Sequence, residues 1–144
     1  MKLYLDTSVL VAYYYPEALS SQVQSLLNTA EKPGLSFLTE VELCSAVAKK
    51  IRSKEIDSPD GSRILAKFFS HVDMELFTII PVANHHWRLA RSWISLFSTP
   101  LRTLDAIHLA IASDADLEMI TADKLLYQAA GVLDVKAQLM TVDG

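Results

Sequence analysis

Two kinds of hydrophobic pattern alternate along the chain. Short apolar runs, typical of buried strands, occupy residues 2–5, 35–38, 76–80, 118–121 and 133–135. Between them, apolar residues recur at steps of three and four positions, which predicts helices over 9–15, 20–30, 39–54, 59–74, 83–97, 105–113 and 122–130. Strands that alternate with helices in this way favour an α/β layered fold with a mainly parallel sheet.

Polar and turn residues are expected to set the ends of these elements. Thr7 or Ser8 is a candidate cap for the first helix, and Thr103 is a candidate cap for the helix over 105–113. Gly131 is expected to end the last helix. No linker, repeat or low-complexity segment divides the chain, and 144 residues suit one domain, so we expect a single domain over residues 1–144.

Composition narrows the class of protein. With 51% hydrophobic and 21% charged residues, the chain is not of the disordered type. The lone Cys44 excludes an internal disulfide framework and a thiolate-rich zinc site. The run from Val9 to Tyr15 is far too short to span a bilayer and no secretion signal is recognisable, so we expect a cytoplasmic protein without a membrane partner. The net charge of −4 neither favours nor excludes nucleic acid, because local patches matter more than the sum.

Four carboxylates stand at positions where a functional site is expected. Asp6 ends the first predicted strand, and Asp123 follows the fourth by two residues. Both can therefore reach the carboxyl edge of a parallel sheet, where ligands bind. Asp105 lies in the first turn of a helix that is otherwise apolar, so its charge requires a partner, a proton or a metal. Glu42 lies at the edge of the apolar stripe of its helix.

Each acid also has a purely structural explanation. Asp6 and Asp123 can cap helices, Asp105 suits the positive end of a helix dipole, and Glu42 can be an ordinary solvated residue. The convergence of all four favours a shared site. Four ionised carboxylates share a pocket only when a cation neutralises them, and all-oxygen ligands select Mg²⁺ or Mn²⁺. Such a site suits phosphodiester hydrolysis, because the metal can activate water and stabilise the developing charge.

Four stretches of the chain carry a resemblance to a known family. They are Tyr4-Leu5-Asp6-Thr7-Ser8, Thr39-Glu40-Val41-Glu42-Leu43, Leu104-Asp105-Ala106-Ile107-His108-Leu109-Ala110 and Thr121-Ala122-Asp123-Lys124-Leu125-Leu126. With them the chain resembles the PIN-domain nucleases and, more narrowly, the VapC-like toxins of type II toxin–antitoxin pairs. In the second stretch Glu40 is a rival of Glu42. The two lie about 200° apart on a helix, so only one can face the pocket, and we choose Glu42.

The resemblance implies a PIN-like three-layer α/β/α fold with a short, mainly parallel central sheet. It implies a Mg²⁺-dependent endoribonuclease that cuts transfer or ribosomal RNA, forms a homodimer and is inhibited by a cognate antitoxin; Mn²⁺ is expected to substitute for Mg²⁺. By the same resemblance, the catalytic residues that hold the metal and the attacking water are Asp6, Glu42, Asp105 and Asp123. Ser8 and Thr121 are expected to orient these carboxylates through their hydroxyls.

Basic and histidine residues near the motifs are weighed against structural explanations. Arg102, three residues before Asp105, is a candidate nucleic-acid contact through a phosphate. The basic residues between Lys49 and Lys54 can steer RNA, but a solvated helix end explains them as well. His108 follows Asp105 by three residues, and we interpret it as a structural histidine.

Two rival hypotheses are open at this point. An enzyme that forms an aspartyl phosphate on Asp6 would want a second acid two residues further on, but Ser8 stands there. A catalytically silent PIN-like domain that acts by binding RNA or a protein partner needs none of the four acids. Their joint presence favours the hydrolase.

Overall fold

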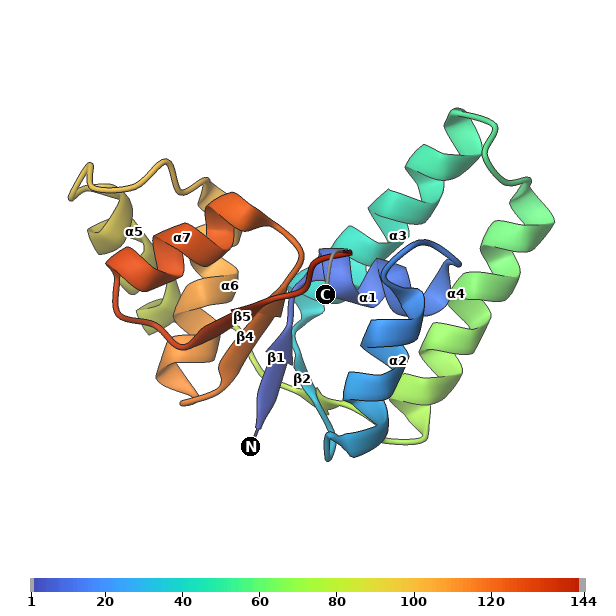
Figure 1. Ribbon diagram of the computed structural model, residues 1–144, viewed down its shortest axis with the longest axis horizontal. Helices are drawn as coiled ribbons and strands as arrows, with labels where there is room; N and C mark the ends of the chain where they lie inside the picture. Colours follow the sequence, from blue (N-terminus) through green and yellow to red (C-terminus); the bar gives the residue numbers. More distant parts are fainter. Residues whose placement is uncertain (1, 143–144) are drawn as a thin grey trace.

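A central parallel sheet organises the molecule (Figure 1). The computed structural model describes residues 2–142. Its sheet has five strands in the order β3-β2-β1-β4-β5, and every neighbouring pair runs parallel. The strands are β1 (Leu3–Leu5), β2 (Gly34–Leu35), β3 (Thr78–Ile79), β4 (Glu118–Thr121) and β5 (Ala137–Leu139). The prediction of a mainly parallel sheet is confirmed.

Helices cover both faces of this sheet. They are α1 (Thr7–Tyr14), α2 (Ser20–Thr29), α3 (Phe37–Arg52), α4 (Ser58–Asp73), α5 (Asn84–Ile94), α6 (Thr103–Asp114) and α7 (Lys124–Val132). Figure 1 shows α1 to α4 on one side of the strands and α5 to α7 on the other. The predicted three-layer α/β/α architecture is therefore confirmed. No helix within the described residues is long and apolar enough to cross a bilayer.

Alternate side chains of the strands enter two separate hydrophobic cores. Leu3 and Leu5 belong to the core formed with α1 to α4, whereas Tyr4 belongs to the core formed with α5 and α6. Every residue of α6 from Ala106 to Ala112 is buried, and all of them except His108 are apolar. Because the middle of α6 is enclosed by the packing of its layer, that packing also sets where its two more exposed ends lie.

The strand order places a crevice at the carboxyl ends of β1 and β4. From the central β1, the strands β2 and β3 extend the sheet on one side, and β4 and β5 extend it on the other. In open parallel sheets, ligands bind outside the carboxyl ends of the strands at such a switch point. β1 ends at Leu5 and β4 ends at Thr121, so Asp6 and Asp123 both follow strands that end at this crevice.

The second strand is shorter than the sequence pattern predicts. β2 ends at Leu35 rather than at residue 38. Ser36 adopts an extended backbone and caps α3, and its N–H donates to the hydroxyl of Thr39 at 3.3 Å. The helix therefore begins at Phe37, before the predicted Thr39. The prediction was wrong because this local capping interaction outweighs the strand preference of the apolar run.

The last strand lies further along the chain than predicted. Gly131 does not end α7, which continues to Val132. The turn is made instead by Asp134, whose φ is 58°. Since Asp also tolerates the left-handed region, the chain turns three residues after the glycine, and the strand forms at 137–139 instead of 133–135.

Three helix ends also differ from the predictions. At the first, the cap of α1 is neither Thr7 nor Ser8 but Asp6, the alternative that the sequence analysis also weighed, and it accepts from the backbone N–H of Val9. Helix α6 already includes Thr103, and Arg102 is its N-cap without a side-chain capping bond. Helix α5 ends at Ile94 instead of residue 97, because the chain turns through residues that include Phe97 with a φ of 57°.

Candidate functional site

Asp6 lies directly after β1 and is held by three donors. The residue is only 5% exposed. Its Oδ1 accepts from the Ser8 hydroxyl at 2.5 Å and from the N–H of Val9 at 3.2 Å. Its Oδ2 accepts from the Thr121 hydroxyl at 2.5 Å. Asp6 therefore caps α1 and, at the same time, is oriented by the hydroxyls of Ser8 and Thr121.

The buried Asp6 carboxylate is short of positive charge. Burial raises the pKa of Asp6, although the bonds from Ser8, Thr121 and Val9 act in the opposite direction. A carboxylate oxygen can accept two hydrogen bonds. Oδ2 takes one within the described residues, so it retains an acceptor position for a cation.

Asp123 is linked to Asp6 through Thr121. Its backbone N–H donates to the Thr121 hydroxyl oxygen at 3.0 Å, and that hydroxyl donates to Asp6. Oδ1 of Asp123 caps α7 by accepting from the N–H groups of Leu125 (2.9 Å) and Leu126 (3.3 Å). The capping role that the sequence analysis weighed for Asp123 is therefore real. It occupies Oδ1 and leaves Oδ2 toward the crevice side, where it meets Arg102 at 3.8 Å.

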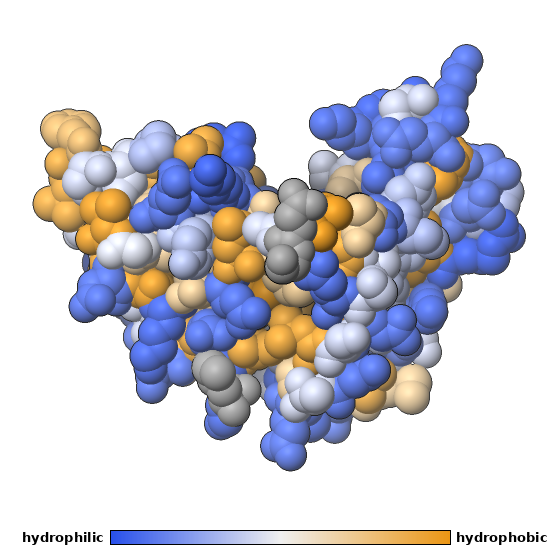
Figure 2. Space-filling model, in the orientation of Figure 1, coloured by the Kyte–Doolittle hydropathy of each residue, from blue (hydrophilic) through white to orange (hydrophobic). Residues whose placement is uncertain are grey.

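Asp105 shares a small cavity with Asp123. The cavity has a volume of about 190 Å³ and is lined by Pro100, Leu101, Arg102, Asp105, Asp123, Leu125 and Leu126. Arg102 donates from Nε to Oδ2 of Asp105 at 3.3 Å. Burial raises the pKa of Asp105, and the negative charge of Asp123 adds to this rise, while Arg102 opposes it. Figure 2 shows the molecule hollowed between the lobe of α5 to α7 and the projecting pair α3 and α4.

Glu42 reaches the crevice from α3. Its Oε1 accepts from the Thr7 hydroxyl at 2.7 Å and from Nε2 of His108. The other ring nitrogen of His108, Nδ1, lies 2.7 Å from the Tyr4 hydroxyl. Burial by itself would raise the pKa of Glu42, but the bonds from His108 and Thr7 outweigh it, so the pKa is lowered. Glu42 is therefore an ionised carboxylate with one oxygen firmly held.

His108 is the residue whose importance the sequence analysis underestimated. It is 2% exposed, it bonds to Glu42, and it is close enough to Asp6 and Asp105 to act electrostatically on both carboxylates. The imidazole therefore lies near three of the four acids. The available signal was its spacing: residue 108 is one helical turn after Asp105 on the same helix.

Glu40 behaves differently from Glu42. Its Oε2 is buried and has no hydrogen-bond partner among residues 2–142. Burial raises the pKa of Glu40. Within the described part of the chain no hydrogen bond or ion pair joins Glu40 to His108 or to the other acids, whereas Glu42 is bonded to His108 directly. This geometry favours Glu42 as the second-motif acid, which stays a prediction.

The residues at the crevice fit a hard divalent cation. Their donors are carboxylate oxygens, which suit Mg²⁺ and Mn²⁺. Burial raises the pKa of Asp6 and Asp105, and a cation among them would relieve that penalty. Here the guanidinium of Arg102 supplies positive charge to Asp105 and Asp123. Its side chain is 79% exposed, so it can turn toward solvent.

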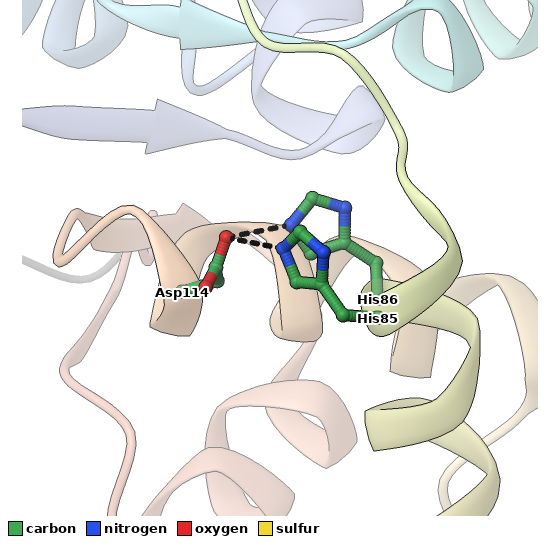
Figure 3. Close-up of side chains that lie close together, drawn as sticks. All are labelled: His85, His86 and Asp114. Atoms are coloured by element: carbon green, nitrogen blue, oxygen red, sulfur yellow. Dashed lines mark hydrogen bonds and ion pairs between the residues drawn. The ribbon is translucent and has the colours of Figure 1, made fainter.

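A second polar cluster lies at the other end of α6 (Figure 3). His85 and His86, from the start of α5, both approach Oδ2 of Asp114 through Nε2, at 2.8 and 2.9 Å. Among the described residues, these form the only group of three or more His, Cys, Asp or Glu side chains whose ligand atoms lie within 4.8 Å of one another. Nδ1 of His86 accepts from the N–H of Ala83 at 2.9 Å, so its Nε2 carries a proton and donates to Asp114. The cluster therefore ties α5 to α6 by hydrogen bonds and is not arranged as a metal site.

Two larger hollows lie away from the four acids. One, of about 420 Å³, is bounded by residues of α1, α2 and the end of α4, among them Tyr13 and His71. The other, of about 930 Å³, lies at the amino ends of the strands, beside Lys2 and Gly34. Neither is lined by any of the four acids.

The aromatic and basic residues of the first helices have structural partners. The Tyr14 hydroxyl lies 2.6 Å from Nδ1 of His71, and Tyr13 packs edge-on against Tyr14. Lys50 pairs with Glu55 at 3.3 Å and lies over the ring of Tyr15. Packing therefore accounts for these tyrosines and for Lys50.

The fold and the site together define a class of protein. It is a parallel α/β/α domain with acidic residues at the carboxyl edge of its sheet. The family model described as "PIN domain" matches residues 3–132. The chain belongs to the PIN domain family. A comparison with curated protein sequences finds no match.

Several solved structures share the fold of this chain. A chain of FitAcB from Neisseria gonorrhoeae aligns with a TM-score of 0.71 and 23% identity, covering 95% of this chain and 96% of that chain. VapC20 from Mycobacterium tuberculosis, a sarcin-ricin loop cleaving toxin, aligns with a TM-score of 0.69 and 13% identity, covering 88% and 94%. A chain of VapBC2 from Rickettsia felis, bound to a promoter DNA fragment, aligns with a TM-score of 0.69 and 14% identity, covering 98% and 100%. At these identities the likeness shows a common fold.

Proposed function

We propose that this PIN-domain protein is a Mg²⁺-dependent endoribonuclease and the toxin of a toxin–antitoxin pair. The observation that carries the proposal is the linkage of three acids at the switch point of the sheet. Thr121 joins Asp6 to Asp123, and Arg102 pairs with both Asp123 and Asp105. Asp105 and Asp123 thus line one cavity, and Thr121 connects it to Asp6, which directly follows β1. This arrangement supports the proposal that a phosphodiester and a cation bind together at this edge of the sheet.

Each residue has a definite part in the proposed reaction. The metal, Mg²⁺ with Mn²⁺ as a substitute, is held by Asp6, Glu42, Asp105 and Asp123. When bound, it supplies an activated water and stabilises charge that develops on the phosphate. Ser8 and Thr121 keep the Asp6 carboxylate in one orientation.

Arg102 is the proposed phosphate contact. Its guanidinium already lies among carboxylates at the cavity, and its exposed side chain can exchange those partners for an RNA phosphate. A guanidinium suits this task because it binds phosphate oxygens in a fixed two-pronged geometry. Nucleic-acid binding by a chain with a net charge of −4 then depends on this local charge.

The partners follow from the same proposal. The substrate is transfer or ribosomal RNA, the protein forms a homodimer, and a cognate antitoxin holds it inactive in the cytoplasm. The supporting likeness is to FitAcB, to VapC20 as a sarcin-ricin loop cleaving toxin and to DNA-bound VapBC2. We further propose that residues 1–144 form a single domain, of which residues 1, 143 and 144 lie outside the described part.

Growth after induced expression in a bacterial host tests this function without knowledge of the RNA target. Wild type is expected to arrest growth and to produce new RNA ends, whereas equally abundant, folded Asp105→Asn is expected to do neither. Equal arrest by both proteins would contradict the proposed nuclease activity and favour a domain that acts by binding.

Two further variants, Glu40→Gln and Glu42→Gln, separate the two candidates for the second motif in the same assay. Only Glu42→Gln is expected to relieve the arrest.

A further inference from the structure

A buried chain of hydrogen bonds runs from β1 through α6 to Glu42. The Tyr4 hydroxyl lies 2.7 Å from Nδ1 of His108, and Nε2 of His108 bonds to Oε1 of Glu42. The Tyr4 hydroxyl also lies 3.0 Å from the Ser36 hydroxyl and 3.4 Å from that of Thr39. Tyr4, Ser36 and Thr39 have no exposed surface, and His108 has almost none. The ring of His108 is therefore fixed at both of its nitrogens.

The donors at Oε1 of Glu42 determine the direction of these bonds. A carboxylate that holds a cation can only accept hydrogen bonds, and the Thr7 hydroxyl donates to the same Oε1 that Nε2 of His108 approaches. Nε2 of His108 therefore carries the proton and donates it into this bond. With the proton on Nε2, Nδ1 is the acceptor of the neutral imidazole, and the Tyr4 hydroxyl at 2.7 Å donates to it.

The two oxygens of Glu42 are left in unequal situations. Oε1 accepts two hydrogen bonds, from Thr7 and from His108, and so has both of its acceptor positions filled. Oε2 accepts no hydrogen bond from the described residues. A cation that uses Glu42 is consequently restricted to Oε2, with the carboxylate plane fixed by the donors on the other oxygen.

We propose that His108 is a positioning residue of this site, which holds Oε1 of Glu42 so that Oε2 alone is presented to the divalent cation. The proposal rests on the proposed function, since it assumes that the four acids bind a metal. It differs from a purely structural role, because it predicts that the donor at the position of Nε2 matters more than the ring. Tyr4 acts one step further away, by keeping the imidazole in the orientation that reaches Glu42.

Two amide variants distinguish the roles of the two ring nitrogens of His108. In His108→Gln the side-chain amide nitrogen can occupy the place of Nε2 and donate to Glu42. In His108→Asn the amide reaches only the place of Nδ1, beside Tyr4. The two variants are matched in polarity and both replace the ring, so a difference between them reports the bond to Glu42.

The experiment is calorimetric titration of the purified full chain with Mn²⁺ alone, without RNA. We expect His108→Asn to bind Mn²⁺ about 10–100-fold more weakly than wild type, the range typical of residues that orient metal ligands. His108→Gln is expected to recover most of that loss. In an RNA cleavage assay, the Mn²⁺ concentration needed for half-maximal rate should rise in the same order, while the KM for RNA stays unchanged.

Equal Mn²⁺ affinity in wild type, His108→Gln and folded His108→Asn would overturn the positioning role, and so would equal weakening in both variants. If His108→Asn does not fold, Tyr4→Phe takes its place, because it removes only the hydroxyl at Nδ1; an unchanged Mn²⁺ affinity in Tyr4→Phe then overturns the proposal. Wild type that binds no Mn²⁺, or binds it as Asp105→Asn does, would overturn the proposed metal site itself, and the positioning role with it. Failure of one proposal is thus distinguished from failure of the other.

Discussion

Each end of α6 carries an aspartate, and the pKa values of the two carboxyl groups are shifted in opposite directions. Asp105, in the first turn, has its pKa raised by burial and by the nearby Asp123, with Arg102 as its main positive partner. Asp114, at the last turn, has its pKa lowered by hydrogen bonds from His85 and His86. One helix therefore holds one carboxylate short of donors and one amply supplied with them.

This contrast separates the acid that we propose to be functional, Asp105, from Asp114, whose contacts are structural. At Asp114 the sequence supplies two imidazole donors, one of them oriented by the N–H of Ala83, and the result is a closed tie between helices. At Asp105 the sequence supplies a second carboxylate instead, which destabilises the ionised pair unless a cation joins it. We therefore regard a cluster of ligand-type atoms at short distance as a weaker sign of a metal site than neighbouring acids whose charge is offset only by one exposed guanidinium.

The loss of Thr121 should have the largest effect among residues that only orient the acids. Thr121→Val keeps the shape of the side chain but removes the hydroxyl that donates to Asp6 and accepts from Asp123. We expect about a 10–100-fold fall in RNA cleavage rate at a fixed Mg²⁺ concentration. Thr29→Val is the matched control, because its hydroxyl bonds only to a carbonyl at the exposed end of α2. Equal rates in the two variants would remove Thr121 from the site.

Arg102→Ala should have a smaller effect, and on RNA binding. One phosphate contact is lost, so the KM for RNA is expected to rise several-fold and the slope of log affinity against log salt to fall by about 1. Arg88→Ala, on the exposed face of α5, controls for the loss of one positive charge. Binding measured over a series of salt concentrations checks this, and identical slopes for both variants would show that Arg102 serves only Asp105 and Asp123.

The smallest effect is expected at the structural end of α6, and on stability alone. Asp114→Ala leaves the buried Nε2 of His86 without its acceptor, so the free energy of unfolding should fall by about 1 kcal/mol while RNA cleavage is unchanged. Because the bonds from His85 and His86 lower the pKa of Asp114, its contribution is present above the unfolded value of about 3.9 and is lost as the pH falls through the folded value. Urea unfolding at pH 7 and at pH 3 should therefore show a deficit in Asp114→Ala at pH 7 that shrinks at pH 3. A deficit that persists at pH 3 would contradict this assignment.

The fold and the positions of the strand-end acids could be predicted from the sequence, because they depend on local patterns. The alternation of short apolar runs with helical periodicity predicts the parallel sheet, which is confirmed. Since parallel strands end at one edge, Asp6 and Asp123 could be assigned to that edge without coordinates. Local signals failed where two of them competed: Ser36 caps α3 within the predicted second strand, and Asp134 makes the turn expected at Gly131.

The contacts among Tyr4, Glu42 and His108 could not be predicted, because they join residues far apart in the chain. The bond between Glu42 and His108 joins α3 to α6, and the contact between Tyr4 and His108 joins β1 to α6. A lone histidine on a buried helix is equally compatible with simple packing, so its partners appear only when the layers are assembled. The chemical roles of the four acids stay predictions.

Metal-dependent cleavage of RNA by a matched pair of α6 variants tests the central claim most directly. Purified wild type, Asp105→Asn and Asp114→Asn would be incubated with total RNA in Mg²⁺ and, separately, in EDTA, and the new RNA ends mapped. We predict the same discrete ends for wild type and Asp114→Asn, none for Asp105→Asn, and none for any protein in EDTA. Cleavage by folded Asp105→Asn equal to that of wild type, or cleavage that persists in EDTA, would contradict a metal-dependent nuclease site at this end of α6.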